Sequence, residues 1–229
     1  MRKNRVLWIA VALMVVSSVG HAMTMTPGTG QKGSWFVGPM MGLNVPAEDL
    51  SNRDLADQGT GFNAGGVVEY MVSDGWSLGV DGGYNSTKSK DAFLFLTTGD
   101  TGNIRAKTTN FGVNANWYIP TGGNMLPYLG AGIGYYSRKL EFEGTGSSSG
   151  FSDSDTKGSI GINGGVGMSF ILAPSIALGI DARYHWTPKD DYDFSSLGVT
   201  ATDVKWSYST FNAALLFHIP TGGAGNQIR

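Results

Sequence analysis

The stretch IALGIDARYHW, residues 176–186, alternates between two kinds of side chain. One set is apolar or aromatic: Ile176, Leu178, Ile180, Ala182, Tyr184 and Trp186. The other set is small, polar or charged: Ala177, Gly179, Asp181, Arg183 and His185. Because successive side chains of a β-strand point to opposite faces, this period of two predicts a strand with one apolar face and one polar face.

Segments of the same kind recur along the chain, and most are ten residues or longer. We expect eight strands, at residues 34–45, 61–72, 76–86, 104–119, 127–142, 157–172, 176–187 and 204–219. Short connections with turn residues, at 73–75, 120–126 and 173–175, alternate with long polar ones at 46–60, 87–103, 143–156 and 188–203. In an antiparallel up-and-down sheet every second connection lies at the same end. One end therefore carries short turns and both termini, and the other carries four long loops.

A shift of 100 residues aligns the chain with itself. The shift matches Leu78-Gly79-x-Asp81-x-x-Tyr84 to Leu178-Gly179-x-Asp181-x-x-Tyr184. It also matches the sequence Ile-Pro-Thr-Gly-Gly at 119–123 to the same sequence at 219–223. An internal repeat of this kind indicates a supersecondary unit used twice. Four strands are followed by a second version of the same four.

Composition narrows the class of protein. The chain has 229 residues, of which 35 are Gly and none is Cys, with 15% charged residues and a formal net charge of −2. It is too rich in Gly and too sparsely charged for an average soluble domain. The absence of Cys excludes disulfide scaffolds, thiolate zinc sites and cysteine nucleophiles. The near-neutral charge argues against a nucleic-acid-binding protein, which usually carries a basic face.

The first 22 residues have the features of a secretory signal. The basic stretch Arg2-Lys3-Asn4-Arg5 precedes an unbroken apolar run at 6–16, and Gly20-His21-Ala22 resembles a small-x-small cleavage site. The apolar run is too short for a spanning helix, which needs about 20 residues. We therefore divide the chain into a signal peptide at 1–22, a barrel at 23–220 and a short C-terminal tail at 221–229.

The position of the charges distinguishes a soluble lipocalin-like barrel from a membrane barrel. The mid-strand charges all lie on the small or polar face of their strands: Glu69, Asp81, Arg138, Asp181 and Arg183. A cation that faces the bilayer midplane costs about 2–4 kcal/mol, so in lipid this face must be the lumen. The opposite face ends in aromatic residues such as Trp76 and Trp117 at the short turns, and Tyr84 and Tyr135 toward the long loops. The predicted fold is all-β, an eight-stranded antiparallel up-and-down transmembrane β-barrel.

The signal peptide, the strand PYLGAGIGY at 127–135 and the aromatic-edged strands that continue to Phe217 resemble the small eight-stranded outer-membrane barrel family, which includes the OmpA transmembrane domain, OmpX and OmpW. The resemblance implies a place in the cell outer membrane of a Gram-negative organism, with termini in the periplasm and long loops outside. It also implies contact with outer-membrane lipid, lipopolysaccharide and the barrel-insertion machinery. Family members commonly end on an aromatic residue that this machinery reads, whereas here a tail to Arg229 follows Phe217.

The interior of an eight-stranded barrel is just wide enough to be filled by side chains or to hold one small ligand. Inward aromatic residues such as Tyr118 and Tyr136 favour a filled interior, although many inward Gly residues leave room. Because single buried charges are costly, we expect salt bridges from the acids to the two arginines within one polar network. Its members are Glu69, Asp81, Arg138, Asp181, Arg183 and His185. The alternative is a gate, since ionisable groups inside membrane proteins are functional candidates.

An enzyme of this fold needs a nucleophile and a base. Some small outer-membrane barrels that resemble this chain modify lipid A through a His and a Ser. Beyond the signal peptide only His185 and His218 remain, and Trp186-Thr187 after His185 breaks the His-x-Ser arrangement. We expect no enzyme activity, and a lipid A-modifying enzyme is the least favoured function. Because the two histidines lie near opposite ends of the barrel, we expect no metal site, and we expect no cofactor.

The loop at 87–103 contains an apolar run, Phe93, Leu94, Phe95 and Leu96. Exposed apolar patches usually mark a contact surface, so the run is a candidate site for an extracellular protein partner or for the lipopolysaccharide layer. A simple extension of the strands is the alternative. We predict a structural or surface-interaction role through the loops. The alternative function is a narrow channel for small or hydrophobic solutes.

Overall fold

The computed structural model describes residues 32–47, 57–90, 101–121, 123–145, 152–194 and 199–220. The signal peptide at 1–22, the tail at 221–229 and the apolar run Phe93–Leu96 lie outside these residues and stay predictions. Within the described ranges, no helix has the length and apolar character needed to cross a membrane.

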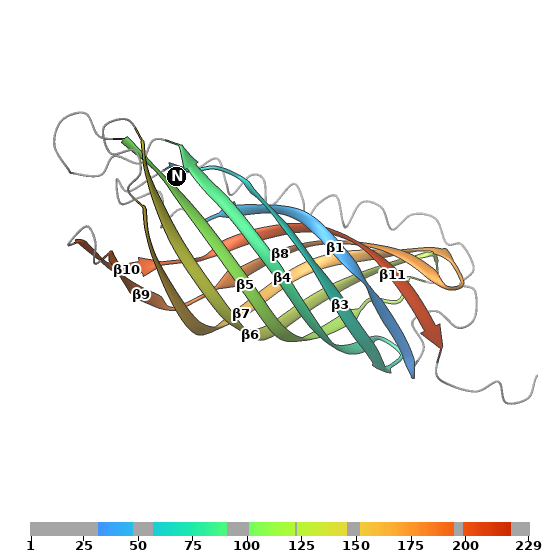
Figure 1. The fold of residues 1–229 in the computed structure, drawn as a ribbon. Coiled ribbons are helices and arrows are strands. Elements are labelled where there is room, and N and C mark those ends of the chain that lie inside the picture. The colour runs from blue at the N-terminus through green and yellow to red at the C-terminus, as the bar shows by residue number, and fades with distance from the viewer. Residues whose placement is uncertain are drawn as a thin grey trace, which may run out of the picture.

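Eight of the described strands form a closed barrel (Figure 1). Each pairs antiparallel with its neighbours in chain order, and the first pairs with the last, from Trp35 opposite Ile219 to Pro46 opposite Tyr208. The predicted fold class is confirmed. The barrel strands are β1 (Ser34–Pro46), β3 (Gly61–Ser73), β4 (Trp76–Lys90), β5 (Thr101–Tyr118), β6 (Met125–Thr145), β7 (Ser152–Ala173), β8 (Ile176–Trp186) and β11 (Tyr208–Pro220).

Three further short strands lie at the end of the barrel that carries the long loops. The two-residue strand β2 (Asp57–Gln58) pairs with the end of β4. The strands β9 (Lys189–Phe194) and β10 (Val199–Lys205) form a hairpin, seen at the left of Figure 1. The prediction of a polar loop at 188–203 and of a last strand from residue 204 was therefore wrong. Tyr192 stands among three aspartates, a composition typical of a solvated loop, which concealed the hairpin.

The strands β5, β6 and β7 extend beyond their predicted ends, so less of the predicted connection at 143–156 lies outside the sheet. Opposite charges face each other across the strands close to these extended ends. Arg105 is in register with Glu141, and Lys107 Nζ lies 2.6 Å from Glu141 Oε2. These residues lie within the predicted strands 104–119 and 127–142, and the ladder continues past them on the loop side of the apolar belt, to Thr101 opposite Thr145.

The outer face has an apolar belt between two rows of aromatic side chains. Exposed apolar residues such as Leu78, Val113 and Ile133 form the belt. On the short-turn side the exposed large residues are Trp35, Trp76, Trp117 and Ile219, and on the long-loop side they are Tyr84, Phe111, Tyr135, Tyr184 and Trp186. The predicted polarity of the two faces is confirmed, since the mid-strand charges lie inside.

The internal repeat corresponds to two equivalent hairpins. The β3–β4 hairpin turns between Ser73 and Trp76, and the β7–β8 hairpin turns between Ala173 and Ile176, with the same register irregularity before each turn. Two strands separate the hairpins on either side in the barrel order, so the hairpins occupy opposite walls. The lumen-facing Asp81 and Asp181 therefore approach the interior from opposite sides.

Replacing Val113 with Arg tests the assignment of the outer face. Val113 is exposed in the apolar belt between Val80 and Ile133, so the arginine would face hydrocarbon and lower the free energy of unfolding by about 2–4 kcal/mol. Urea unfolding in lipid vesicles, followed by tryptophan fluorescence, measures the change. The control Val113→Leu stays apolar and should change stability by less than about 0.5 kcal/mol. Equal effects of the two variants would contradict the assignment.

Candidate functional site

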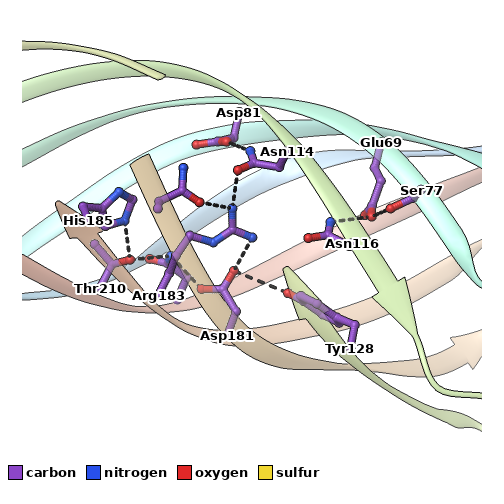
Figure 2. Close-up of polar contacts among 12 residues, drawn as sticks. Glu69, Ser77, Asp81, Asn114, Asn116, Tyr128, Asp181, Arg183, His185 and Thr210 are labelled. Carbon is purple, nitrogen blue, oxygen red and sulfur yellow. Dashed lines mark hydrogen bonds and ion pairs between the residues drawn. The ribbon is translucent and has the colours of Figure 1, made fainter. Parts of the chain in front are cut away.

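The barrel interior has three layers. At the short-turn end lies a buried apolar cluster, the short-turn cluster: Phe36, Met71, Tyr118, Leu126, Ala177 and Leu216. At the long-loop end lies a second one, the hairpin cluster: Ala106, Tyr136, Leu140, Tyr192, Val204, Trp206 and Tyr208. A polar layer lies between the two clusters. Figure 2 shows its polar contacts. Because the hairpin cluster includes side chains of β9 and β10, the β9–β10 hairpin covers the barrel mouth.

Arg183 lies at the centre of the polar layer (Figure 2). Its Nη1 donates to Asn114 Oδ1 at 2.7 Å and to Asn163 Oδ1 at 3.2 Å. Its Nη2 lies 3.9 Å from Asp181 Oδ2. Asn114 also donates to Asp81. A single arginine thus connects β5, β7 and β8, and it reaches Asp81 through a neutral amide.

Neutral side chains supply most of the hydrogen bonds to the two aspartates. Asp81 accepts from Asn110 Nδ2 at 3.4 Å, in addition to the bond from Asn114. Asp181 accepts from Asn212 Nδ2 at 2.9 Å and from the Tyr128 hydroxyl at 3.4 Å. The carboxylates are therefore held by a frame of amides and phenols rather than by arginines alone.

Glu69 is buried among neutral donors, whereas we expected an arginine as its partner. It accepts from Ser77, from Asn116 Nδ2 at 2.7 Å, and from the Tyr118 hydroxyl at 3.0 and 2.9 Å on its two oxygens. Glu69 is opposite Gly79, two residues closer to the short turns than Asp81. Its height along the barrel therefore brings it beside the Tyr118 hydroxyl instead of Arg183.

Arg138 is fully buried but belongs to the hairpin instead of the polar layer. Its Nη1 donates to Thr187 Oγ1 at 2.9 Å and to the Pro188 carbonyl at 3.2 Å. Its Nη2 donates to Ser159 Oγ at 2.7 Å and forms an ion pair with Asp190 of β9. The expected pairing of Arg138 with lumen carboxylates was wrong, because β9 brings an acid to it that the sequence had placed in an irregular loop.

Both histidines face the interior and have neutral partners. The His185 ring stacks on Tyr208 with centroids 4.6 Å apart, and its nitrogens lie 3.1 Å from the Tyr136 hydroxyl and 3.2 Å from Thr210 Oγ1. His218 Nδ1 donates to the Pro174 carbonyl at 2.8 Å. In the part of the chain that the structure describes, no group of three or more His, Asp or Glu side chains is arranged to hold a metal ion.

The polar layer encloses a cavity of about 60 Å³, called here the chamber. Its lining includes the three acids, Arg183, His185 and several asparagines. A polar space of this size holds a few water molecules, whereas ligand pockets are usually several times larger. Inward glycines make room for bulky neighbours, since a side-chain carbon at Gly167 would overlap the Tyr128 ring. Side chains therefore fill most of the interior.

A second group of charges lies on the outward face of β5 and β6, on the loop side of Phe111 and Tyr135. Glu141 Oε1 accepts from Lys107 Nζ at 2.7 Å and lies 3.0 Å from Lys139 Nζ. The hydrogen bond from Lys107 lowers the pKa of Glu141 from its usual value, so this carboxylate stays ionised near neutral pH. Arg105 also lies 3.9 Å from Glu141.

The structure brings together most of the site residues proposed from the sequence. Asp81, Asp181 and Arg183 form one network, Glu69 and His185 line the same chamber, and Arg138 lies apart. Sequence reasoning missed the asparagines that connect them: Asn110, Asn114, Asn116, Asn163 and Asn212. The sequence did contain a sign of them, since Asn110, Asn114 and Asn116 all occupy lumen-facing positions of a single strand, β5.

Comparison with known proteins agrees with this architecture. A family model described as an outer membrane protein beta-barrel domain matches residues 9–223. The chain belongs to this family. The predicted resemblance to small outer-membrane barrels and the predicted location in the outer membrane are confirmed.

Solved structures resemble this outer-membrane barrel in fold at low sequence identity. A major outer membrane protein from Thermus thermophilus is 13% identical with a TM-score of 0.53, covering 81% of this chain and 99% of that one. OprG from Pseudomonas aeruginosa is 13% identical with a TM-score of 0.50, covering 82% and 97%. The outer membrane protease OmpT from Escherichia coli is 7% identical with a TM-score of 0.38, covering 86% and 99%. No curated protein sequence matches the chain.

Replacing Arg183 with Met should lower the free energy of unfolding of this outer-membrane barrel by about 3–5 kcal/mol, because the largely buried Asp181 loses its neighbouring cation. Urea unfolding measures the loss. The double variant Arg183→Met with Asp181→Asn removes both charges and should recover part of it. Arg105→Met removes an arginine outside the lumen and should cost less than about 1 kcal/mol. Unchanged urea resistance of the first variant would contradict the role given to Arg183.

Proposed function

We propose that this outer-membrane barrel is a non-conducting structural protein that acts through its surface, where it contacts lipopolysaccharide and extracellular partners. The observation that carries the proposal is the pair of apolar clusters on either side of the polar layer. Ions cross an apolar constriction only when water wets it. Buried rings at both ends therefore argue against a continuous aqueous path through the lumen.

The attachment of the β9–β10 hairpin supports a closed mouth. Tyr192 is 0% exposed and Trp206 is 3% exposed, so both rings are inserted into the hairpin cluster. The ion pair between Arg138 and Asp190 joins the hairpin to the barrel wall, and Thr187 Oγ1 donates to the Trp206 carbonyl at 2.5 Å. Polar contacts thus hold the hairpin where its rings fill the mouth.

The placement of the histidines supports a non-enzymatic role. A barrel that modifies a membrane lipid needs its base within reach of the lipid or of the mouth. His185 is enclosed between Tyr136, Tyr208 and Thr210, and His218 is bound to a backbone carbonyl. Neither is oriented by a carboxylate, as the base of a catalytic triad is.

Outward-facing cations support contact with lipopolysaccharide. Lys88 is in register with Arg105, and Lys107 is in register with Lys139, so four cations lie together on β4, β5 and β6. They lie on the loop side of the exposed ring of Phe111. Aromatic girdles of membrane barrels lie at the interfaces with the head groups. Among the described side chains of this surface the carboxylates are Glu141 and Glu143, so the four cations outnumber them. Phosphate groups pair strongly with such Lys and Arg side chains.

In planar bilayers, the wild-type protein should give no unitary conductance steps, because both ends of the lumen are closed by buried rings. Clear steps in the wild type would contradict the proposal and would support the narrow channel for small or hydrophobic solutes.

The natural absence of Cys allows a matched accessibility control. The variant Thr210→Cys changes a position buried in the polar layer, so its thiol should react slowly with a water-soluble reagent in otherwise wild-type protein. Adding Tyr192→Ala and Trp206→Ala removes the ring of β9 and the ring that directly follows β10, and should speed the reaction at least about tenfold, since modification follows the open population. Tyr135→Ala on the outer face should leave the rate unchanged.

Replacing Lys107 and Lys139 with Gln should weaken binding of purified lipopolysaccharide about tenfold or more, because each cation near an anionic surface contributes about 1 kcal/mol. Titration of the detergent-solubilised protein, followed by tryptophan fluorescence, measures the affinity. Lys189→Gln removes an exposed cation of the hairpin and serves as the matched control. Equal affinity of wild type for phosphorylated and dephosphorylated lipid A would contradict a role of these cations in phosphate binding.

A further inference from the structure

Two lysines face each other across β5 and β6 on the outer surface, on the loop side of the aromatic row. Lys107 is directly opposite Lys139 in the register. Like charges in this position weaken the pairing of two strands, because directly opposite side chains lie about 5 Å apart. Arg105 follows on the same face of β5, two residues further toward the long loops. Three cations are therefore gathered on two neighbouring strands, an arrangement that is unfavourable by itself.

Glu141 is the carboxylate that offsets this repulsion. Its Oε1 and Oε2 lie 2.7 and 2.6 Å from Lys107 Nζ, and its Oε1 also lies 3.0 Å from Lys139 Nζ. Its Oε2 lies 3.9 Å from Arg105 Nη1. The Glu141 side chain is 16% exposed, whereas those of the two lysines are 27% and 43% exposed. The cations thus enclose one carboxylate and remain more accessible than it is.

The Glu141 carboxylate lies where this cation cluster can bind an anion. Carboxylates and phosphates form charge-assisted hydrogen bonds with the same Lys and Arg donors, so an external phosphate has to compete with Glu141 for them. A carboxylate carries one negative charge. A phosphate monoester carries about 1.5 to 2 negative charges at pH 7 and has three strong acceptor oxygens. A monoester therefore gains by replacing Glu141, whereas a singly charged group exchanges one charge for another.

We propose that Glu141 is an internal competitor for phosphate, so that this surface retains lipids with a phosphate monoester and binds lipids with singly charged head groups only weakly. The proposal rests on the proposed function, because it concerns the same lysines. Without lipid, Glu141 balances the cations and preserves the pairing of β5 and β6. When lipid binds, its phosphate takes the place of the carboxylate between Lys107 and Lys139, and Glu141 turns toward water.

The test compares two lipids with identical acyl chains. Dioleoyl phosphatidate has a phosphate monoester, and dioleoyl phosphatidylglycerol has a phosphodiester with one charge. Each lipid is titrated into the detergent-solubilised protein at pH 8, and binding is followed by tryptophan fluorescence. Wild type should bind phosphatidate about fivefold more tightly, because the lipid brings nearly one further charge to the cations. Equal affinities for the two lipids overturn the proposal.

The variant Glu141→Gln removes the competitor and nearly preserves the shape of the side chain. It should bind both lipids about fivefold more tightly, so that phosphatidylglycerol binds the variant about as well as phosphatidate binds wild type. The control Asp203→Asn removes an exposed carboxylate 3.5 Å from Lys189 on the hairpin and should change neither affinity. Unchanged or weaker binding by Glu141→Gln overturns the proposal, because Glu141 would then only hold the lysines in place.

A change of pH gives a measurement that needs no variant. At pH 5 a phosphate monoester loses its second charge, since its second pKa is about 6. The lowered pKa of Glu141 keeps this carboxylate ionised at pH 5, and the surrounding Lys88, Arg105, Lys107 and Lys139 remain charged. Wild type should therefore bind phosphatidate no more tightly than phosphatidylglycerol. A preference for phosphatidate that persists at pH 5 overturns the proposal.

The same titrations separate this proposal from the proposed function. If Lys107→Gln with Lys139→Gln binds both lipids as tightly as wild type, the lysines do not hold phosphate, and both proposals are overturned. If this double variant binds more weakly but Glu141→Gln does not bind more tightly than wild type, only the role of Glu141 as a competitor is overturned.

Discussion

The hydrocarbon around the barrel determines where a charged side chain of a spanning strand can lie. A cation at the bilayer midplane costs about 2–4 kcal/mol, so the charges of the spanning segments all face a lumen only eight strands wide. Bulk water does not fill so narrow a space, and each charge needs a partner from a neighbouring strand. Arg183 and the asparagines of β5 supply these partners. The polar layer is thus a direct result of the apolar exterior.

The layered interior separates two structural tasks. Hydrogen bonds inside the polar layer are strengthened by the low dielectric that the two apolar clusters create. Arg138 acts outside this layer, where it attaches the β9–β10 hairpin through Asp190. The hairpin can therefore be altered without removing any charge from the chamber. Changes in the hairpin therefore affect the closure of the mouth, and changes in the polar layer affect the stability of the barrel wall.

The alternation of side chains was sufficient to predict the barrel, its two faces and its eight strands. Alternation assigns a residue to a face, but it does not give the height of that residue along the barrel, which depends on strand tilt and register. Glu69 was assigned the wrong partner for this reason, whereas the partner of Arg138 was missed because Asp190 lies in the segment predicted to be a loop. The asparagines were overlooked because neutral residues give no charge signal. The hairpin was overlooked because its buried rings are few and lie among aspartates.

The seam between β1 and β11 has a consequence for the order of assembly. Strands from the two ends of the barrel sequence meet there, so neither sheet edge finds its permanent neighbour until the final strand, Tyr208–Pro220, has been synthesised. Pairings of such large sequence separation form slowly, and open edges attract foreign strands in the meantime. The barrel therefore cannot close before its last strand is available to pair with the first. The protein therefore depends on being kept apart from other unfolded chains until its last segment arrives.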